Sequence, residues 1–242
     1  MKISVVVPVR NEADNIIPLL EEITAALVCA EAYEIIYVND GSTDATPAVL
    51  QQALTQFSQL RVLQHPESYG QSTAIYTGVK AARQPWIATL DGDGQNDPAV
   101  IPRLYQVLMS QRQQQPKLSM VAGWRSDRHD SAWRLLSSKI ANGVRATLLG
   151  DNTPDTGCGL KVFSREQFLQ LPYFDHMHRF LPALILRNGG LVISEPVNHR
   201  ARMRGQSKYG TLDRLWVGIV DLLGVIWLQK RAKVAEVTEL DR

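Results

Sequence analysis

The chain has 242 residues, which is enough to bury a full hydrophobic core in one large domain with a short appendage. Hydrophobic residues make up 45% and charged residues 21%, as in ordinary soluble globular proteins, so composition selects no fold class. The net charge of +2 is too small to indicate a nucleic-acid-binding protein. Function therefore has to be inferred from motifs and their order along the chain.

Short apolar runs and helical stretches alternate along the first half of the chain. The apolar runs predict strands, most of them buried on both faces, at residues 3–9, 34–38, 60–64, 86–90 and 118–122. The stretches between them predict helices at about 13–29, 45–57, 72–82 and 98–112. This alternation predicts an α/β fold with a mostly parallel central sheet and helices on both faces. Ligands of such folds bind beyond the carboxyl ends of the strands.

Three of the predicted strands end in segments rich in carboxylates and amides. The first leads into Pro8-Val-Arg-Asn-Glu12, the second into Asn39-Asp-Gly-Ser-Thr-Asp44, and the fourth into Asp91-Gly-Asp-Gly-Gln-Asn-Asp97. The sequence lacks the glycine fingerprint of dinucleotide folds after the first strand, and it lacks a Gly-Lys-Ser/Thr phosphate loop. The sequence therefore does not favour a nicotinamide or ATP site.

Asp91 and Asp93 are spaced so that both carboxylates can bind one divalent cation and leave positions open for phosphate oxygens. Gln95 is the candidate for a further oxygen ligand. The alternative is an acidic turn, which Asp-Gly pairs favour. An EF-hand does not fit, because Asn96 and Pro102 stand where the calcium loop needs glycine and glutamate. We favour the metal site because three acidic strand ends converge.

These segments resemble the inverting family 2 glycosyltransferases of GT-A fold, and the resemblance covers about residues 3–210. It rests on Val-Val-Pro-Val-Arg-Asn-Glu, Val-Asn-Asp-Gly-Ser-Thr-Asp and Leu-Asp-Gly-Asp-Gly-Gln-Asn-Asp-Pro in this order. Three further motifs resemble dolichol-phosphate mannose synthases and bacterial polyprenyl-phosphate glycosyltransferases: Tyr69-Gly-Gln-Ser-Thr-Ala-Ile, Asp155-Thr-Gly-Cys-Gly-Leu-Lys and Arg202-Met-Arg-Gly-Gln-Ser-Lys-Tyr209. The resemblance implies transfer of one sugar from a GDP- or UDP-linked donor to a polyprenyl monophosphate.

On the donor side, the resemblance implies a nucleotide-sugar pocket with a bound Mg²⁺ or Mn²⁺. The residues expected in the pocket are Pro8, Asn11, Glu12, Asp40, Asp91 and Asp93. The cation is expected to bind Asp91, Asp93 and Gln95. Two positions depart from the family pattern: Gly94 replaces a residue that is often hydrophobic, and Cys158-Gly-Leu replaces the usual Ser-Gly-Phe. We expect Cys158 to be a packing residue, since a free cysteine usually behaves as a small buried hydrophobe.

On the acceptor side, the resemblance implies positively charged side chains. A lipid monophosphate is already anionic near neutral pH, so it needs orientation, whereas a hydroxyl acceptor needs a general base. The residues expected to bind the acceptor phosphate are Arg125, Arg134, Ser137, Arg202, Ser207 and Lys208. We expect Arg128, Arg145 and Arg204 on the surface.

Asp155 separates two enzyme hypotheses. In a lipid-phosphate enzyme it would orient an arginine or the sugar hydroxyls, and in a family 2 enzyme that acts on a saccharide hydroxyl it would be the base. The candidate catalytic residues are therefore Asp93, Arg125, Arg134 and Asp155. A subunit that binds nucleotide sugars without turnover is a third hypothesis.

Residues 212–228 form a broad apolar face when placed on a helix, interrupted by Arg214 and Asp221. No uncharged apolar run reaches the roughly 18–20 residues that a transmembrane helix needs. The tryptophans and the following Lys230, Arg231 and Lys233 suit a helix in a membrane interface. A helix packed on the core or on a partner subunit fits the pattern equally well.

We expect a catalytic domain at residues 1–210 and an amphipathic segment at 211–242. Cys29 and Cys158 offer neither a disulfide framework nor metal-ligand spacing, and the N-terminus does not read as a signal peptide. These features favour the cytosolic face of a membrane, reached by peripheral contact or through a membrane-protein partner. Whether the chain forms a homo-oligomer stays open.

Overall fold

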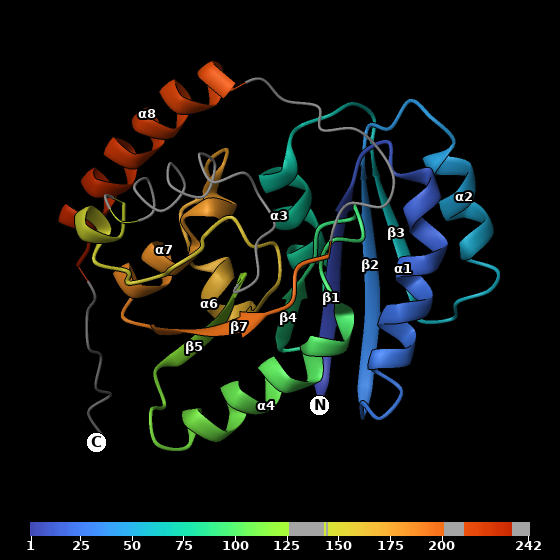
Figure 1. Ribbon diagram of the computed structural model, residues 1–242, viewed down its shortest axis with the longest axis horizontal. Helices are drawn as coiled ribbons and strands as arrows, with labels where there is room; N and C mark the ends of the chain where they lie inside the picture. Colours follow the sequence, from blue (N-terminus) through green and yellow to red (C-terminus); the bar gives the residue numbers. More distant parts are fainter. Residues whose placement is uncertain (126–142, 144, 201–210, 234–242) are drawn as a thin grey trace, which may run out of the picture.

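A seven-stranded sheet with helices on both faces organises the chain (Figure 1). The computed structural model describes residues 1–125, 143, 145–200 and 211–233, without the side chains of 211–216. The strand order is β3-β2-β1-β4-β6-β5-β7. The strands are β1 (Lys2–Val9), β2 (Ala32–Asp40), β3 (Leu60–His65), β4 (Trp86–Thr89), β5 (Leu118–Arg125), β6 (Lys161–Ser164) and β7 (Leu191–Val197). The predicted α/β class is confirmed, and all five predicted strands occur.

The sheet has a parallel half and a mixed half. Strands β3, β2, β1 and β4 run parallel to one another, whereas β6 is antiparallel to both of its neighbours, β4 and β5. Strand β7 is parallel to β5 at the edge. The carboxyl ends of β1, β2 and β4 therefore share one rim, and β6 starts at that rim because it runs the other way.

Helices cover the two faces of the sheet in two separate hydrophobic clusters. One face packs against α1 (Ala13–Ala26), α2 (Thr46–Ala53) and α4 (Ile101–Arg112). The other packs against α3 (Gln71–Ala81), α6 (Arg165–Leu169) and α7 (Leu181–Arg187). Alternation along β1 explains the division, since Val5 and Val7 belong to the first cluster and Val6 to the second. Short 3₁₀ turns lie at Pro98–Val100 and Met177–Arg179.

The sequence analysis predicted neither β6 nor β7. Strand β6 has four residues and includes Lys161, which interrupts the apolar run. Strand β7 has an exposed first residue and contains Pro196, which is disfavoured inside a sheet and tolerated at its edge. Both strands are stabilised by their place beside β5 and β4, which the local sequence does not reveal.

Arg145 is buried, so the expectation that it lies on the surface was wrong. Its side chain is in the helical residues 145–149 and is only 9% exposed as a whole residue. Its guanidinium binds Asp151, with Nη1 to Oδ2 at 2.6 Å and Nη2 to Oδ1 at 3.1 Å. This pair holds the turn after the helix, because Nη2 also donates to the carbonyl oxygen of Thr153.

The C-terminal helix α8 (Thr211–Lys230) packs on α7 at one side of the molecule (Figure 1). Val225 is fully buried in the same cluster as the α7 side chains. Arg187 adds a hydrogen bond of 3.0 Å from its Nε to the carbonyl oxygen of Leu228. Val220, Leu223 and Trp227 are 52%, 61% and 58% exposed on the helix. In the part of the chain that the structure describes, no helix is long and apolar enough to cross a membrane.

The packing of α3 on β1 can be tested at Gly78. A Cβ built there would lie 2.4 Å from Val6 Cγ1 and 3.2 Å from Val38 Cγ2, so a methyl group overpacks the core. We expect Gly78→Ala to lower the free energy of unfolding by about 1–3 kcal/mol. Chemical denaturation measures this change, and a Gly78→Ala variant as stable as wild type would contradict the packing.

Gly224 of α8 is the matched control. A Cβ built there meets nothing within 4 Å, so the added methyl group has no steric cost. Because glycine weakens a helix relative to alanine, we expect Gly224→Ala to raise the free energy of unfolding by up to about 1 kcal/mol.

Candidate active site

The loops that follow β1, β2 and β4 are joined into one rim. Asn11 has a positive φ of 55°, and its backbone N–H donates to Ser42 Oγ at 2.9 Å while its side-chain Oδ1 accepts from the Thr43 N–H at 2.7 Å. Glu12 is tied to the start of α2, because its N–H donates to Thr46 Oγ1 at 2.9 Å. The two predicted nucleotide-contacting residues therefore lie against the loop after β2.

Gly92 brings the loop after β4 against the end of β1. A Cβ on Gly92 would lie 2.4 Å from Val9 Cγ1 and 3.0 Å from the carbonyl oxygen of Pro8. Only glycine permits this close approach. The structure thus places Pro8, another predicted pocket residue, directly beside the acidic motif.

Asp40 holds the loop between β3 and α3. Its carboxylate contacts four protein partners: His65 Nδ1 at 2.8 Å, Ser68 Oγ at 2.8 Å, Tyr69 N at 2.9 Å and Gly70 N at 2.9 Å. Burial alone would raise the pKa of Asp40, but these hydrogen bonds lower it below its usual value. The loop that Asp40 fixes leads into Gln71 at the start of α3. The nucleotide role of Asp40 stays a prediction.

Asp91 is half-buried at the centre of the rim. Its backbone N–H donates to Asn96 Oδ1 at 3.0 Å, and its Oδ1 accepts from Gln71 Nε2 at 2.8 Å. Gly159 lies against the carboxyl group, since a Cβ there would be 2.4 Å from Asp91 Cγ. Burial, followed by the negative charge of Asp93, raises the pKa of Asp91 to about 6. The site therefore concentrates negative charge that a cation would stabilise.

The chemistry of these groups fits Mg²⁺ or Mn²⁺. Asp91 and Asp93 offer carboxylate oxygens, the ligands that hard divalent cations prefer. Among the residues that the structure describes, no cluster of three His, Cys, Asp or Glu side chains forms a complete metal site. Two carboxylates from one loop would leave positions on such a cation open for water and phosphate oxygens.

Gln95 is anchored to the segment after β7. Its backbone N–H donates to Asp93 Oδ1 at 3.1 Å, and its Nε2 lies 3.3 Å from His199 Nε2 and 3.2 Å from the carbonyl oxygen of Arg200. These contacts keep Gln95 next to Asp93. Its role as a metal ligand stays a prediction.

Arg125, at the end of β5, forms a two-point ion pair with Asp155. Nε lies 2.5 Å from Oδ2 and Nη2 lies 2.8 Å from Oδ1. Burial lowers the pKa of Arg125, but the hydrogen bonds and charge of Asp155 outweigh it and raise the pKa above its usual value. A carboxylate paired with a guanidinium is a weak base. The geometry favours Asp155 as the residue that orients Arg125.

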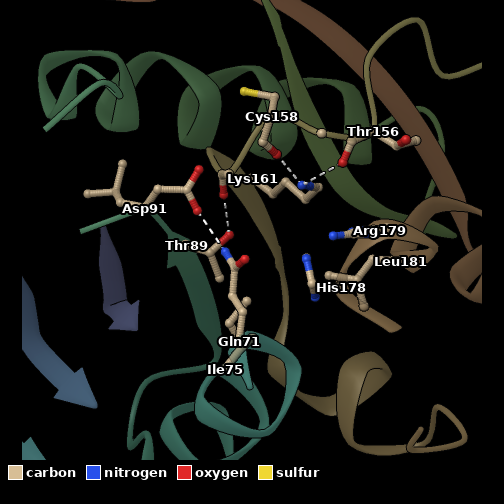
Figure 2. A pocket seen from close by; sticks show the side chains of 13 residues that line it. Gln71, Ile75, Thr89, Asp91, Thr156, Cys158, Lys161, His178, Arg179 and Leu181 are labelled. Atoms are coloured by element: carbon tan, nitrogen blue, oxygen red, sulfur yellow. Dashed lines mark hydrogen bonds between the residues drawn. The ribbon is translucent and has the colours of Figure 1, made fainter. Parts of the chain in front are cut away.

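A cavity of about 200 Å³ lies beside Asp91, between α3, β4 and the segment before β6 (Figure 2). Its polar wall combines residues from distant parts of the sequence: Gln71, Thr89, Asp91, Thr156, Lys161, His178 and Arg179. Sequence reasoning assigned a role to Asp91 alone among them. Gln71, Thr156 and Lys161 lie within motifs that carried the family resemblance, which was the available signal. His178 and Arg179 lie in no such motif.

Cys158 lines the same cavity and is buried with the core, as a packing residue would be. Five predicted acceptor residues lie outside the described residues: Arg134, Ser137, Arg202, Ser207 and Lys208. Arg128 and Arg204, expected on the surface, lie there too. Of the predicted acceptor cations, the structure describes Arg125.

Comparison with known families and proteins gives consistent matches. The family described as Glycosyl transferase family 2 matches residues 4–171. A dodecaprenyl-phosphate galacturonate synthase of Rhizobium johnstonii is 35% identical over 238 residues, 95% of this chain and 68% of that protein. An undecaprenyl-phosphate 4-deoxy-4-formamido-L-arabinose transferase of Edwardsiella ictaluri is 32% identical over 212 residues. That match covers 87% of this chain and 63% of the relative, so the chain spans about two thirds of the length of both proteins.

Solved structures show the same fold. Glucosyl-3-phosphoglycerate synthase from Mycobacterium tuberculosis, in complex with Mn²⁺, UDP and glucosyl-3-phosphoglycerate, superposes with a TM-score of 0.68. The identity is 20%, and the match covers 97% of this chain and 81% of that one. Mannosyl-3-phosphoglycerate synthase from Rubrobacter xylanophilus gives a TM-score of 0.66 at 18% identity, with 99% and 77% covered. The predicted GT-A fold is confirmed.

Proton competition at Asp91 predicts how metal binding depends on pH. Below about pH 6 the carboxyl group is protonated and must release its proton to bind a cation. We expect the apparent affinity for Mn²⁺ to fall about tenfold per pH unit below about 6. Thermal unfolding with and without Mn²⁺, between about pH 4.5 and 8, measures the effect.

The metal-free protein has the opposite dependence. The pKa of Asp91 in the folded state, about 6, lies above its ordinary value of 3.8. The contribution of Asp91 to the free energy of unfolding is therefore fully present below pH 3.8 and is lost as the pH rises through about 6. Asp91→Asn is the control and should remove both dependences. Equal stabilisation by Mn²⁺ at about pH 5 and 7.5 would contradict the assignment.

Proposed function

The chain belongs to glycosyl transferase family 2, and we propose that it transfers one sugar from a nucleotide diphosphate sugar to a polyprenyl monophosphate, with inversion at the anomeric carbon. The observation that carries this proposal is the partly buried Arg125–Asp155 ion pair. In this ion pair the carboxylate of Asp155, the candidate base, is engaged by Arg125. The guanidinium group of Arg125 would lie at the acceptor side of the site. The names of the relatives, both polyprenyl-phosphate enzymes, support the same acceptor.

On the donor side, the rim of β1, β2 and β4 would bind the nucleotide. Asn11 and Glu12 lie beside the loop after β2, where a base and ribose would find polar partners. Asp91 and Asp93 would hold Mg²⁺ or Mn²⁺ against the diphosphate. That cation would supply charge stabilisation for the departing nucleoside diphosphate. Gln71 keeps Asp91 in place through its 2.8 Å hydrogen bond.

On the acceptor side, Arg125 would orient the lipid phosphate. A phosphate oxygen attacks the anomeric carbon, a new C–O bond forms, and the bond to the nucleoside diphosphate breaks. No proton has to be removed from the ionised phosphate, so the site needs a cation rather than a base. Asp155 would act through Arg125, whose side chain it fixes at two points. Arg134, Ser137, Arg202, Ser207 and Lys208 are proposed to complete the phosphate site.

An activity assay tests the proposal. Nucleotide sugars linked to GDP or UDP are incubated with undecaprenyl phosphate and Mg²⁺ or Mn²⁺, and acid-labile sugar is counted in the organic phase. We expect Asp93→Ala to lower the rate about 100-fold or more, because a metal-binding carboxylate is lost. Full activity of Asp93→Ala would exclude the metal role, and product formed only with a saccharide acceptor would exclude the lipid phosphate.

Glu31→Ala is the matched control for that substitution. Glu31 is an exposed carboxylate that pairs with Lys2 at 2.9 Å, at the opposite end of β1 from the rim. Its removal takes away one negative charge from the protein without touching the site. We expect its rate to equal that of wild type.

We also propose that the outer face of α8 binds the cytosolic surface of a membrane. Val220, Leu223 and Trp227 are more than half exposed on this face. Exposed Lys230, Arg231 and Lys233 follow at the C-terminal end of the helix. Apolar side chains flanked by cations suit insertion among anionic headgroups. The inner face is used elsewhere, because Val225 is buried against the α7 cluster.

Vesicle binding tests this contact. We expect Leu223→Asp to weaken binding to vesicles of mixed anionic and neutral phospholipid about tenfold or more, because a charge replaces an inserted apolar side chain. Val28→Asp is the matched control, since Val28 is 76% exposed outside α8. Unchanged binding of Leu223→Asp would argue against the helix and in favour of a membrane-protein partner.

A further inference from the structure

Two basic side chains line the cavity beside Asp91. Of the residues that line it, Lys161 and Arg179 carry basic side chains and Asp91 is the carboxylate. Asp91 belongs to the proposed metal site, where a bound cation would neutralise its charge. The other charged side chains of the wall are then the basic groups of Lys161 and Arg179.

Lys161 is built into the wall of the cavity. The residue is 4% exposed, and its Nζ donates to the carbonyl oxygens of Cys158 and, at 3.5 Å, Thr156. These contacts use two of the three N–H donors of an ammonium group. Among the described residues the structure pairs Lys161 with no carboxylate. Burial lowers the pKa of Lys161, while the charges of Asp91 and Asp155 act in the opposite direction. An anion brought by a ligand would stabilise the buried ammonium group further.

His178 and Arg179 face Lys161 from the other side of the cavity. The backbone of the 3₁₀ turn is held by Ser72 of α3, whose Oγ lies 2.7 Å from His178 Nδ1 and accepts the His178 N–H at 3.2 Å. Burial and then the charges of Arg179 and Lys161 lower the pKa of His178 well below its usual value. In Figure 2, nitrogen atoms of Lys161, His178 and Arg179 point into one space. The ring of His178 is therefore neutral between two cations.

The position of the cavity identifies which part of a substrate reaches these cations. In a nucleotide sugar the diphosphate lies between the nucleoside and the sugar. If the cation at Asp91 and Asp93 binds the diphosphate, the sugar is the next group along and lies at the mouth of the cavity. The volume of about 200 Å³ is below the roughly 300 Å³ at which pockets for drug-sized ligands begin. The cavity therefore suits a sugar rather than a whole nucleotide sugar.

We propose that this cavity selects a donor whose sugar carries a carboxylate, a uronic acid, with the carboxylate bound between Lys161 and Arg179. The inference rests on the proposed function of the same site and adds the class of sugar. Thr156, Gln71 and the neutral His178 would contact hydroxyl groups of the ring. A phosphate of the lipid acceptor has the same oxyanion chemistry, so the experiment has to separate the two sources.

Equilibrium binding of matched donor pairs tests the sugar without any acceptor. The full chain is titrated, with Mn²⁺ present, with UDP-galacturonate and UDP-galactose, and then with GDP-mannuronate and GDP-mannose. We expect the uronate of at least one pair to bind about tenfold or more tightly than its neutral partner. Neutral donors that bind as tightly as uronates in both pairs, or no binding of any donor, would overturn the inference.

Two variants assign the preference to the cavity. Lys161→Met nearly keeps the length of the side chain and removes its charge. Arg179→Gln removes the charge at a less buried position and leaves a shorter polar side chain. We expect each to reduce the ratio of uronate to neutral affinity at least fivefold. Lys80→Met, on the exposed side of α3, is the matched control and should keep the wild-type ratio. Circular dichroism checks that each variant is folded, and an unchanged ratio in a folded Arg179→Gln overturns the inference.

Transfer kinetics separate the remaining outcomes. If Lys161→Met raises the KM for undecaprenyl phosphate and leaves the donor ratio unchanged, the cavity binds the acceptor phosphate and the inference is wrong. If uronate preference is present but no sugar reaches a polyprenyl phosphate, the proposed acceptor fails while the sugar class holds. Transfer of neutral sugars at equal efficiency would leave the proposed function intact and exclude the uronate.

Discussion

The contact between Asp91 and the backbone of Gly159 joins the two halves of the site. Asp91 ends a parallel strand of the first half of the chain, and Gly159 precedes an antiparallel strand of the second half. The reversed direction of β6 brings its start to the same rim as the end of β4. With a side chain at residue 159, the Asp91 carboxyl group would have to move, since a Cβ would lie 2.4 Å from its Cγ. Donor chemistry and the cavity wall thus depend on one close approach.

That approach concentrates charge of both signs within a small region. Asp91 and Asp93 repel each other, Arg125 and Asp155 neutralise each other, and Lys161 lies buried nearby. Such an arrangement costs folding free energy unless a ligand completes it. A cation at the carboxylates would offset the repulsion between Asp91 and Asp93, and an anion at Lys161 would offset the burial of its charge. A nucleotide sugar with its bound metal supplies the cation, and it also supplies the anion when its sugar is a uronic acid.

The sequence predicts the donor half of this site well because its determinants are local. Strand ends at Pro8, Asp40 and Asp91 follow apolar runs, and the topology of parallel strands brings such ends together without further information. The other half depends on contacts between distant segments. Strands β6 and β7 have weak local signals and are held by their neighbours in the sheet, since β6 pairs with both β4 and β5 and β7 pairs with β5. Lys161, His178 and Arg179 come together only through the folding of distant segments, so no spacing in the sequence predicts that they share a cavity. Arg145 looked like a surface residue because its partner Asp151 gives no periodic pattern.

The donor rim depends on local sequence and the cavity depends on contacts between distant segments. This difference affects how the specificity for the sugar can change within one fold. In the proposed function, the carboxylates on the rim of β1, β2 and β4 would bind the nucleotide diphosphate with its cation, whatever sugar is attached. The segment from Thr156 to Lys161 touches this rim at Gly159, which packs against the Asp91 carboxyl group, whereas the Lys161 side chain donates to the carbonyl oxygens of Thr156 and Cys158. The hydrogen bonds that join the loops after β1 and β2 link Asn11 to Ser42 and Thr43 and link Glu12 to Thr46, and none of these residues lines the cavity. On the proposed assignment, substitutions at Lys161 and Arg179 would alter the preferred sugar while these loop contacts stay as they are. If Lys161 and Arg179 bind a uronate, the cavity rather than the acidic motif distinguishes one sugar from another.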